Sequence, residues 1–278
     1  MDGIIVINKP TGMTSHDVIN RLRKKYQQKK FGHTGTLDPQ ASGVLVVLAG
    51  RAAKLLQFLE DTDKEYIASL KFGQKTDTGD IWGTVLESKE INSDFDFEQI
   101  LDSLKGPLCL QVPAYSAKKV NGKKLVDLAR NDREIPEIYQ NIEIYDAKNL
   151  DSLDQEENTH KFKVSCSSGT YVRSICEEIG RRTNNLACMS ELIRTKASGF
   201  DLEQAEDLDA SEHTIYPMTS VLNLPQVHFE PIQDIYNGKH VRIDTDANRV
   251  LIMDQDEPIA VYDRHHQNVF SCTRGLWS

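Results

Sequence analysis

Short apolar runs and amphipathic stripes alternate along the chain and predict a mixture of strands and helices. Strands are predicted where β-branched or alternating apolar residues cluster, at 4–10, 44–48, 64–73, 141–150 and 160–169. Helices are predicted where apolar residues recur every three to four positions, at 14–26, 96–106 and 170–183. Because strands and helices do not alternate regularly, the pattern favours an α+β fold over a doubly wound one.

The two ends of the chain differ in their predicted secondary structure. The first predicted helix has Ser15 as its N-cap and carries a stripe of Val18, Leu22 and Tyr26. From residue 216 onward, short strand-like runs alternate with turn residues, and no long helical pattern remains. We therefore expect two domains, a larger one over residues 1–215 and a small β-domain over residues 216–278.

The stretch GHTGTLDPQASGVLVVL, at residues 32–48, places polar turn residues directly before a buried strand. Pro39 restricts the residue before it to an extended backbone, so Asp38 is held at a rigid point. The glycines on either side of Asp38 permit tight bends of the chain. An Asp-Pro pair is also an ordinary turn former, so the pattern alone leaves a purely structural role for Asp38 open.

This stretch resembles the signature of the TruB family of tRNA pseudouridine synthases, in which the aspartate is the nucleophile. The resemblance spans most of residues 3–210. Further motifs that match are VINKPTGMTSHDVINRLRK, KEYIASLKFGQKTDTGDIWG, PAYSAKKVNGKKLVDLAR, SSGTYVRSICEEIG and LIRTKASGFDLEQAEDL. The chain departs from the family at Ile193, where an arginine is frequent, and in the residues just before Leu192.

The resemblance implies a pseudouridine-synthase-like fold, with a mixed, mainly antiparallel sheet and flanking helices. The small C-terminal domain resembles a shortened PUA module. The implied activity is the isomerisation of uridine 55 in the T-loop of tRNA, by a stand-alone enzyme that uses no guide RNA. The target base must be flipped out before its N1–C1′ bond is broken and C5 is joined to C1′. This reaction needs no metal and no cofactor, and the sequence carries no GxGxxG, Walker or HExxH motif.

The resemblance also implies three catalytic residues. Asp38 attacks or stabilises C1′ of the target nucleotide, a role that requires an ionised carboxylate beside the sugar. Arg173 keeps this carboxylate ionised and fixes its direction. Tyr66 stacks on the base and is the candidate for removing the proton from C5.

Four further residues are predicted to bind the substrate. His33 resembles the family residue that fills the space beside the flipped nucleotide, while Tyr171 and Leu192 correspond to walls of the pocket. For Tyr171 and Leu192, plain core packing is the alternative. Lys9 follows the first predicted strand, where either a contact with the RNA backbone or a scaffold contact is expected.

Charge is distributed unevenly along a chain whose net charge is −9. Residues 1–54 hold nine Lys and Arg against three Asp and Glu, and the blocks 115–133 and 161–200 are also basic. Any one block is equally explained as a solvated surface, but three together indicate a groove for a polyanion, here the T-arm of tRNA. The basic insertion at about 107–140 is expected to be a mobile loop that closes on the T-arm. A noncatalytic tRNA-binding or folding chaperone is the alternative. Such a protein would need the basic blocks but not Asp38, Tyr66 and Arg173 together.

Cysteine usage and hydropathy bound the remaining possibilities. The five cysteines are scattered and form no CxxC pair, which predicts free thiols and no zinc site. The sequence has no apolar run of membrane-spanning length. We expect a cytoplasmic monomer that does not bind a membrane.

Overall fold

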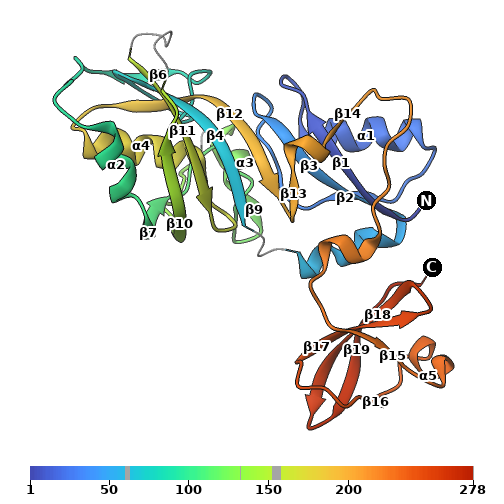
Figure 1. Cartoon of the computed structure of the whole chain (residues 1–278). Coiled ribbons are helices and arrows are strands. Elements are labelled where there is room, and N and C mark those ends of the chain that lie inside the picture. Colours follow the sequence, from blue (N-terminus) through green and yellow to red (C-terminus); the bar gives the residue numbers. More distant parts are fainter. Residues whose placement is uncertain (60–62, 132, 152–157, 278) are drawn as a thin grey trace. The chain divides into compact units, whose positions relative to one another are not determined.

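The computed structural model describes residues 1–59, 63–131, 133–151 and 158–277 (Figure 1). The chain divides into two compact units. The first unit consists of Met1–Asp38, Leu45–Glu60 and Ser198–Ser278, and the second of Pro39–Val44 and Asp61–Ala197. The chain therefore passes from one unit to the other directly after Asp38. The domain boundary between residues 215 and 216, inferred from the sequence, stays a prediction.

The predicted elements are present in the described residues, together with shorter ones. The α-helices are α1 (Ser15–Lys25), α2 (Phe97–Ser103), α3 (Leu125–Ala129), α4 (Val172–Arg182) and α5 (Ile232–Tyr236), and the 3-10 helices are η1 (Gly50–Phe58), η2 (Leu202–Gln204) and η3 (Met218–Val221). The strands are β1 (Gly3–Lys9), β2 (Phe31–His33), β3 (Ser42–Ala49), β4 (Lys64–Phe72), β5 (Gln74–Thr76), β6 (Val85–Ser88), β7 (Gly106–Gln111), β8 (Lys119–Val120), β9 (Lys123–Lys124), β10 (Tyr139–Asn149), β11 (Thr159–Cys166), β12 (Ala187–Ala197), β13 (Phe200–Asp201), β14 (Glu206–Asp207), β15 (Gln226–His228), β16 (Val241–Arg242), β17 (Arg249–Asp254), β18 (Glu257–His266) and β19 (Val269–Gly275).

The hydrogen-bonded order of the main strands is β14-β1-β3-β12-β4-β11-β10-β7, with β2 paired to β3 and β13 to β12. The pairs β12–β4, β4–β11, β11–β10 and β10–β7 are antiparallel, whereas β14–β1 and β3–β12 are parallel. Near the C-terminus, β15-β17-β18-β19-β16 form a separate five-stranded sheet. The predicted α+β fold, with a mixed and mainly antiparallel sheet and a small C-terminal β-domain, is confirmed.

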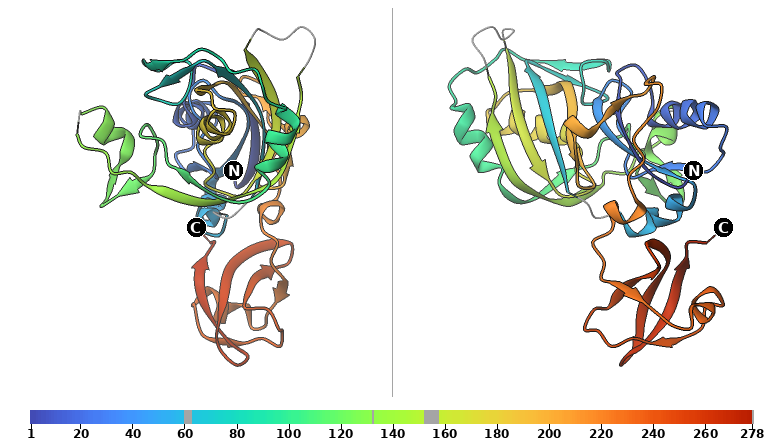
Figure 2. Two further views of the ribbon diagram at one scale, coloured as in Figure 1. Left: turned by 90° about the vertical axis from the view of Figure 1, so that its left-hand side faces the viewer. Right: turned by 45° about the vertical axis from the view of Figure 1, so that its right-hand side comes forward.

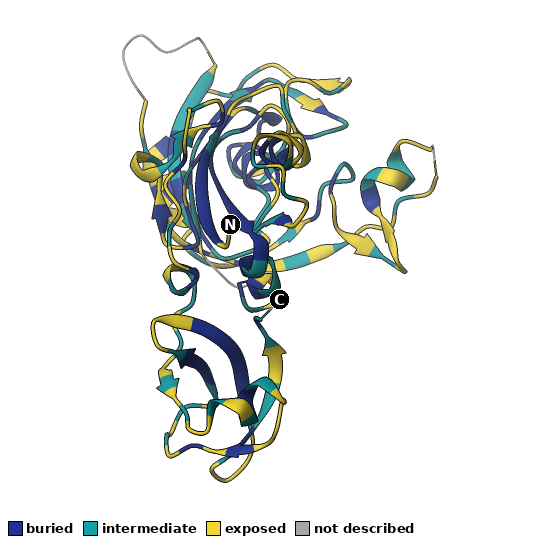
Figure 3. Cartoon of the chain, turned by 90° about the vertical axis from the view of Figure 1, so that its right-hand side faces the viewer, coloured by how far each residue is buried: buried dark blue, intermediate teal, exposed yellow. Residues whose placement is uncertain are grey.

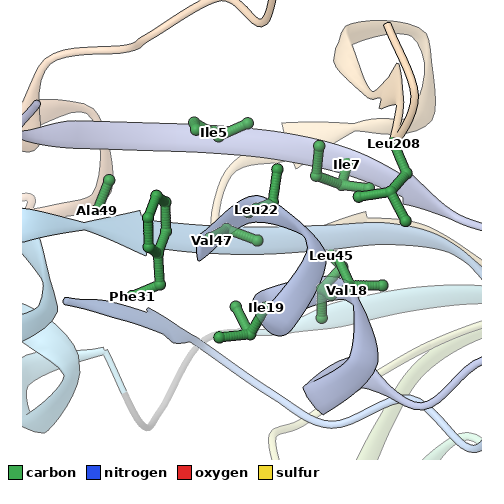
Figure 4. Close-up of a cluster of buried hydrophobic side chains, with 10 residues drawn as sticks. All are labelled: Ile5, Ile7, Val18, Ile19, Leu22, Phe31, Leu45, Val47, Ala49 and Leu208. Atoms are coloured by element: carbon green, nitrogen blue, oxygen red, sulfur yellow. The ribbon is translucent and has the colours of Figure 1, made fainter. Parts of the chain in front are cut away.

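The core of the first unit forms where α1 covers β1 and β3. The helix contributes Val18, Ile19 and Leu22, which are at most 2% exposed, to a cluster completed by Ile5, Ile7, Phe31, Leu45, Val47, Ala49 and Leu208 (Figure 4). Burial of each large aliphatic side chain stabilises the fold by about 1.5–3 kcal/mol. This cluster holds α1 against the strands on either side of the loop that contains Asp38.

The N-cap of α1 is Thr14, so the prediction of Ser15 was wrong. The Thr14 hydroxyl accepts a hydrogen bond from the Asp17 backbone at 3.1 Å, and the Asp17 carboxylate accepts one from the Thr14 backbone at 3.0 Å. The motif is a capping box, which requires an acidic or amide residue three positions after the cap. Asp17 stands three positions after Thr14, and this spacing decides between the two hydroxyl residues.

In the second unit, α4 packs against β12, β4 and β7, and α2 packs against β10 and α4 (Figure 2). The buried stripe of α4 includes Val172, Ile175, Cys176 and Ile179, as the apolar spacing predicts. All five cysteines are free, which confirms the prediction of unpaired thiols. Burial raises the pKa of the Cys166 thiol to about 11, so this thiol is protonated at neutral pH.

The C-terminal sheet has its own core. The central strands β17 and β18 contribute Val250, Ile252, Ala260 and Tyr262, all with no exposed surface. Buried stretches of this sheet are dark blue in Figure 3. Ile235 of α5 packs into the same cluster and is also fully buried. This sheet therefore buries an apolar face of its own, as the short alternating runs after residue 216 predict.

Gly43 is expected to be required for stability. It pairs with Arg194 across the parallel β3–β12 ladder, and a Cβ atom added at Gly43 would lie 2.2 Å from the Arg194 carbonyl oxygen. Its φ of +102° is also unfavourable for a residue with a side chain. Gly43→Ala should lower the free energy of unfolding by about 2 kcal/mol or more, measured by urea denaturation.

Gly32→Ala is the matched control for this measurement. Gly32 lies in β2, but apart from its chain neighbours no heavy atom lies within 4 Å of the position its Cβ would take, and its φ lies outside the left-handed region. The free energy of unfolding should change by about 1 kcal/mol or less. Equal stability of the two variants would contradict the steric argument.

Candidate active site

The loop that carries Asp38 begins from a paired strand. β2 runs antiparallel to β3, with Phe31 opposite Ala49 and His33 opposite Val47. The Thr34 backbone then donates to the Val46 carbonyl at 3.1 Å, which continues the pairing one residue beyond β2. The first part of the signature is therefore a short strand, and the chain leaves the sheet only after Thr34.

The end of the loop is held by Ser15, the first residue of α1. The Ser15 hydroxyl accepts a hydrogen bond from the Leu37 N–H at 2.9 Å and donates one to the Leu37 carbonyl at 3.3 Å. Ser15 is 1% exposed and Leu37 is 3% exposed, so both bonds are shielded from water. The residue directly before Asp38 thus has both of its main-chain groups bound by one side chain.

A second side-chain bond supports the same loop. The Ser198 hydroxyl, directly after β12, donates to the Thr34 hydroxyl at 3.0 Å. Sequence reasoning missed both serines as loop contacts. Ser15 and Leu37 lie 22 positions apart, so no local pattern signals that they meet.

The predicted site residues of the first unit differ in exposure. Asp38 and His33 are both half-buried, which leaves part of each side chain accessible. Lys9 has no exposed surface, and its ammonium group donates to the carbonyls of Pro10 at 2.8 Å and Met13 at 2.6 Å. This geometry supports the scaffold alternative for Lys9, since a fully buried ammonium group does not reach a phosphate in solvent.

Tyr66 and Leu192 lie on one face of the sheet in the second unit. Tyr66 of β4 is directly opposite Arg194 of β12, and Leu192 is opposite Ala68. Directly opposite residues of an antiparallel pair share a face, and side chains two positions apart along a strand do as well. The strand register therefore brings Tyr66, Leu192 and Arg194 to the same face.

Arg194 is the largest fully buried side chain of the described residues. It is 1% exposed, and its Nε donates to the Val44 carbonyl at 2.8 Å. The sequence shows it only as part of a matching motif, because an arginine on an alternating strand is usually exposed. Its burial beside Tyr66 makes it a supporting residue of the site.

A network of polar groups on the neighbouring positions ties three strands together around Tyr66. Glu65 of β4 accepts a hydrogen bond from Thr195 of β12 at 2.8 Å and forms an ion pair with Lys163 of β11 at 2.8 Å. Burial raises the pKa of Glu65, but the hydrogen bonds from Lys163 and Thr195 outweigh this effect and hold the pKa below its ordinary value. The backbone of Tyr66 is thereby fixed from both sides.

Tyr171 and Arg173 lie at the start of α4. Tyr171 is the half-buried N-cap residue, and Arg173 is 5% exposed. The Arg173 guanidinium donates to the carbonyls of Thr78 at 2.8 Å and Tyr115 at 3.1 Å. It therefore connects the loop after β5 with the first residue of the basic block 115–133.

Glu177, one turn further along α4, has a carboxyl group whose pKa is raised by burial, an effect that Lys75 and Arg173 partly offset.

Within residues 1–59, 63–131, 133–151 and 158–277, no group of three or more His, Cys, Asp or Glu side chains could hold a metal ion. No helix in these ranges has both the length and the apolar character that crossing a bilayer requires.

The fold is also found in a solved RNA–protein complex. The chain is similar to the solved structure of an H/ACA RNP bound to a substrate RNA containing 2′-deoxyuridine, with a TM-score of 0.72 and 22% identity over 99% of this chain and 85% of that chain. At this level of identity, the likeness establishes the pseudouridine-synthase fold and not the substrate.

Sequence comparison identifies the family. The N-terminal domain of the TruB family of pseudouridylate synthases matches residues 23–172. Relatives named tRNA pseudouridine synthase B include the protein of Lactobacillus johnsonii, 37% identical over 95% of both chains. The protein of Bacillus subtilis is 40% identical over 80% of this chain and 77% of that relative. The chain belongs to the TruB family, which confirms the resemblance inferred from its motifs.

The two hydrogen bonds between Ser15 and Leu37, here called the Ser15 clamp, are expected to matter for catalysis as well as for folding. Ser15→Ala leaves the buried N–H and carbonyl of Leu37 without their partner, which should cost about 1–3 kcal/mol of stability. We expect kcat for pseudouridine formation to fall at least tenfold, because the loop loses its fixed geometry, while KM for tRNA changes little. Steady-state kinetics on unmodified tRNA measure kcat and KM, and urea denaturation measures the loss of stability.

Ser69→Ala provides a control for general destabilisation. Ser69 is 6% exposed, lies in β4 opposite Glu191 of β12, and donates to the Glu191 carboxylate at 3.2 Å. This variant should keep its kcat at a temperature where it is folded. If Ser15→Ala also kept its kcat there, the clamp would be purely structural.

Proposed function

We propose that the chain is a stand-alone tRNA pseudouridine synthase that isomerises uridine 55 of the T-loop, with Asp38 as the nucleophile. One observation carries the proposal: the aspartate of a family signature follows directly on a residue whose N–H and carbonyl are both bound by Ser15. A carboxylate that must approach one carbon atom of a sugar gains from such a rigid loop. The half-buried position of Asp38 leaves it accessible to substrate.

The proposed reaction needs only side-chain chemistry. The Asp38 carboxylate stabilises or attacks C1′ as the N1–C1′ bond breaks, and C5 of the released uracil then joins C1′. Arg173 keeps the carboxylate ionised, and the Tyr66 hydroxyl is the candidate for removing the proton from C5. A C1′ adduct and a glycal intermediate both fit these roles.

The target uridine must leave the folded T-loop, at a general cost of a few kcal/mol. We assign His33, Tyr171 and Leu192 to the walls that receive the flipped nucleotide. His33 and Tyr171 are half-buried, and Leu192 is 7% exposed on the sheet face shared with Tyr66. These contacts replace the stacking that the base loses.

The basic insertion supplies the electrostatic part of the proposal. β8 and β9 form a hairpin whose turn residues, Asn121 and Gly122, both have positive φ. Four lysines lie on this hairpin and just before it, and all are exposed: Lys118, Lys119, Lys123 and Lys124. We propose that they contact phosphates of the T-arm. We also propose that the enzyme works as a monomer in the cytoplasm, without a guide RNA.

A noncatalytic tRNA chaperone is the alternative function. It would use the same lysines but would have no need for a rigid nucleophile loop or for a tyrosine fixed on the sheet. The anchoring of the Asp38 loop by Ser15 and of Tyr66 by neighbouring strands favours the enzyme.

Asp38→Asn should abolish turnover and retain tRNA binding, because the amide keeps the size of the side chain and loses the charge that the sugar carbon requires. Incubation with an unmodified tRNA transcript, followed by mapping of pseudouridine at single-nucleotide resolution, measures the effect. Asp209→Asn, at a surface ion pair with Arg21, is the control and should retain full activity. A product at a site outside the T-loop with the unsubstituted chain would overturn the substrate assignment.

Replacement of the four insertion lysines by glutamine should weaken tRNA binding and flatten the slope of log affinity against log salt. Each phosphate contact that is lost reduces the slope by about 0.7–0.9, because fewer counterions are released on binding. A filter-binding titration at four salt concentrations measures the slope. An unchanged slope with an intact fold would place the RNA-binding surface elsewhere, for which the basic residues 1–54 are the next candidate.

A further inference from the structure

The loop between β5 and β6 exposes two large apolar side chains. Trp82 is 48% exposed and Ile81 is 38% exposed, although each would gain free energy by burial. The chain has only two tryptophans, and the other, Trp277, packs against Tyr236 near the C-terminus. Large exposed aromatic residues on a loop mark a surface that binds a partner.

This loop is rigid, which distinguishes it from an ordinary surface turn. The Ile81 N–H donates to the Met189 carbonyl at 2.9 Å, and the Met189 N–H donates to the Gly79 carbonyl at 3.0 Å. The Thr76 hydroxyl also donates to the Asp80 carbonyl at 2.7 Å. The backbone beside Trp82 is thus attached to β12, so an aromatic ring here is presented at low cost in entropy.

The acidic groups of the loop are bound within the loop itself. Asp80 accepts hydrogen bonds from the Thr78 hydroxyl at 2.7 Å and the Trp82 N–H at 3.1 Å. Asp77 accepts one from the Thr84 N–H at 2.7 Å. With carboxylates of this kind beside it, the loop does not attract a phosphate, and its exposed contribution is the apolar surface of Ile81 and Trp82.

The loop is also continuous with a proposed catalytic residue. Arg173 donates to the Thr78 carbonyl at 2.8 Å, and a Cβ atom added at Gly79 would lie 3.4 Å from the Arg173 Cβ. A ligand on the exposed rim of this loop therefore binds next to the elements that hold Arg173.

We propose that Trp82, supported by Ile81, is a stacking platform for an unpaired nucleobase of the tRNA substrate, other than the reacting uridine. A nucleobase fits because the indole face is a large, flat π-surface, and stacking on aromatic side chains is the usual way in which proteins hold unstacked RNA bases. The inference rests on the proposed function, since it takes tRNA as the substrate.

Fluorescence tests the platform without reference to activity. In the full-length Trp277→Phe variant, Trp82 is the sole tryptophan, and titration with unmodified tRNA transcript should quench its emission as a base stacks on it. Asp38→Asn is added to this variant and to the Trp82→Phe reference so that no product forms during the titration. The Trp82→Phe variant, which retains Trp277, is the reference and should respond much less.

Affinity measurements provide the second test. Trp82→Ala should raise Kd for the transcript about tenfold, while Trp82→Phe retains an aromatic face and should restore most of the affinity. Val85→Ala is the matched control, because Val85 is 50% exposed on the adjoining strand but has no ring.

The outcomes separate the platform from the proposed function. If the transcript binds but leaves Trp82 emission and the affinity of Trp82→Ala unchanged, the platform is overturned and the proposed function stands. If the unsubstituted chain neither binds the transcript nor forms pseudouridine, the proposed function itself fails. Emission of Trp82 that changes with protein concentration in the absence of RNA would assign this surface to self-association and would also overturn the platform.

Discussion

The hydrogen bonds between Ser15 and Leu37, together with the close approach of Gly43 to Arg194, fix the segment on which the proposed chemistry depends. One anchor lies directly before Asp38 and the other five residues after it. Neither anchor tolerates much change, since the first is buried and the second leaves no room for a Cβ atom. Rigidity on both sides lets a short loop keep a carboxylate at one place.

Buried cations support the main chain within each of the two units. Lys9, Arg173 and Arg194 are each at most 5% exposed, and each donates to main-chain carbonyls of loops or strand ends. A charged donor makes a stronger hydrogen bond than a neutral one, and burial of the charge is costly unless such acceptors are present. Lys9 and Arg173 therefore stabilise loop backbone, and Arg194 binds the carbonyl of Val44 in β3.

The surface chemistry follows a different logic from the interior. The chain is acidic overall, yet four exposed lysines lie on or just before the β8–β9 hairpin, and an exposed tryptophan lies on a loop attached to β12. Lysines act on phosphates at long range and regardless of sequence, whereas an aromatic ring acts only on contact. The combination suits a substrate that is recognised first by charge and then by the shape of its loops.

The sequence by itself determined the fold class and the family, because these depend on patterns within short stretches, and the same patterns single out Asp38 as the proposed nucleophile. The stripe of α1 and the turn at Asn121 and Gly122 are local as well, and both were predicted. Tertiary structure alone decided which side chains of the motifs face water. The partner of Ser15 is 22 positions away, and the burial of Lys9 and Arg194 and the exposure of Trp82 depend on neighbours brought together by the sheet. The physical reason is that hydrogen bonding along a helix or turn is set by residues a few positions apart, whereas burial is set by contacts between distant segments.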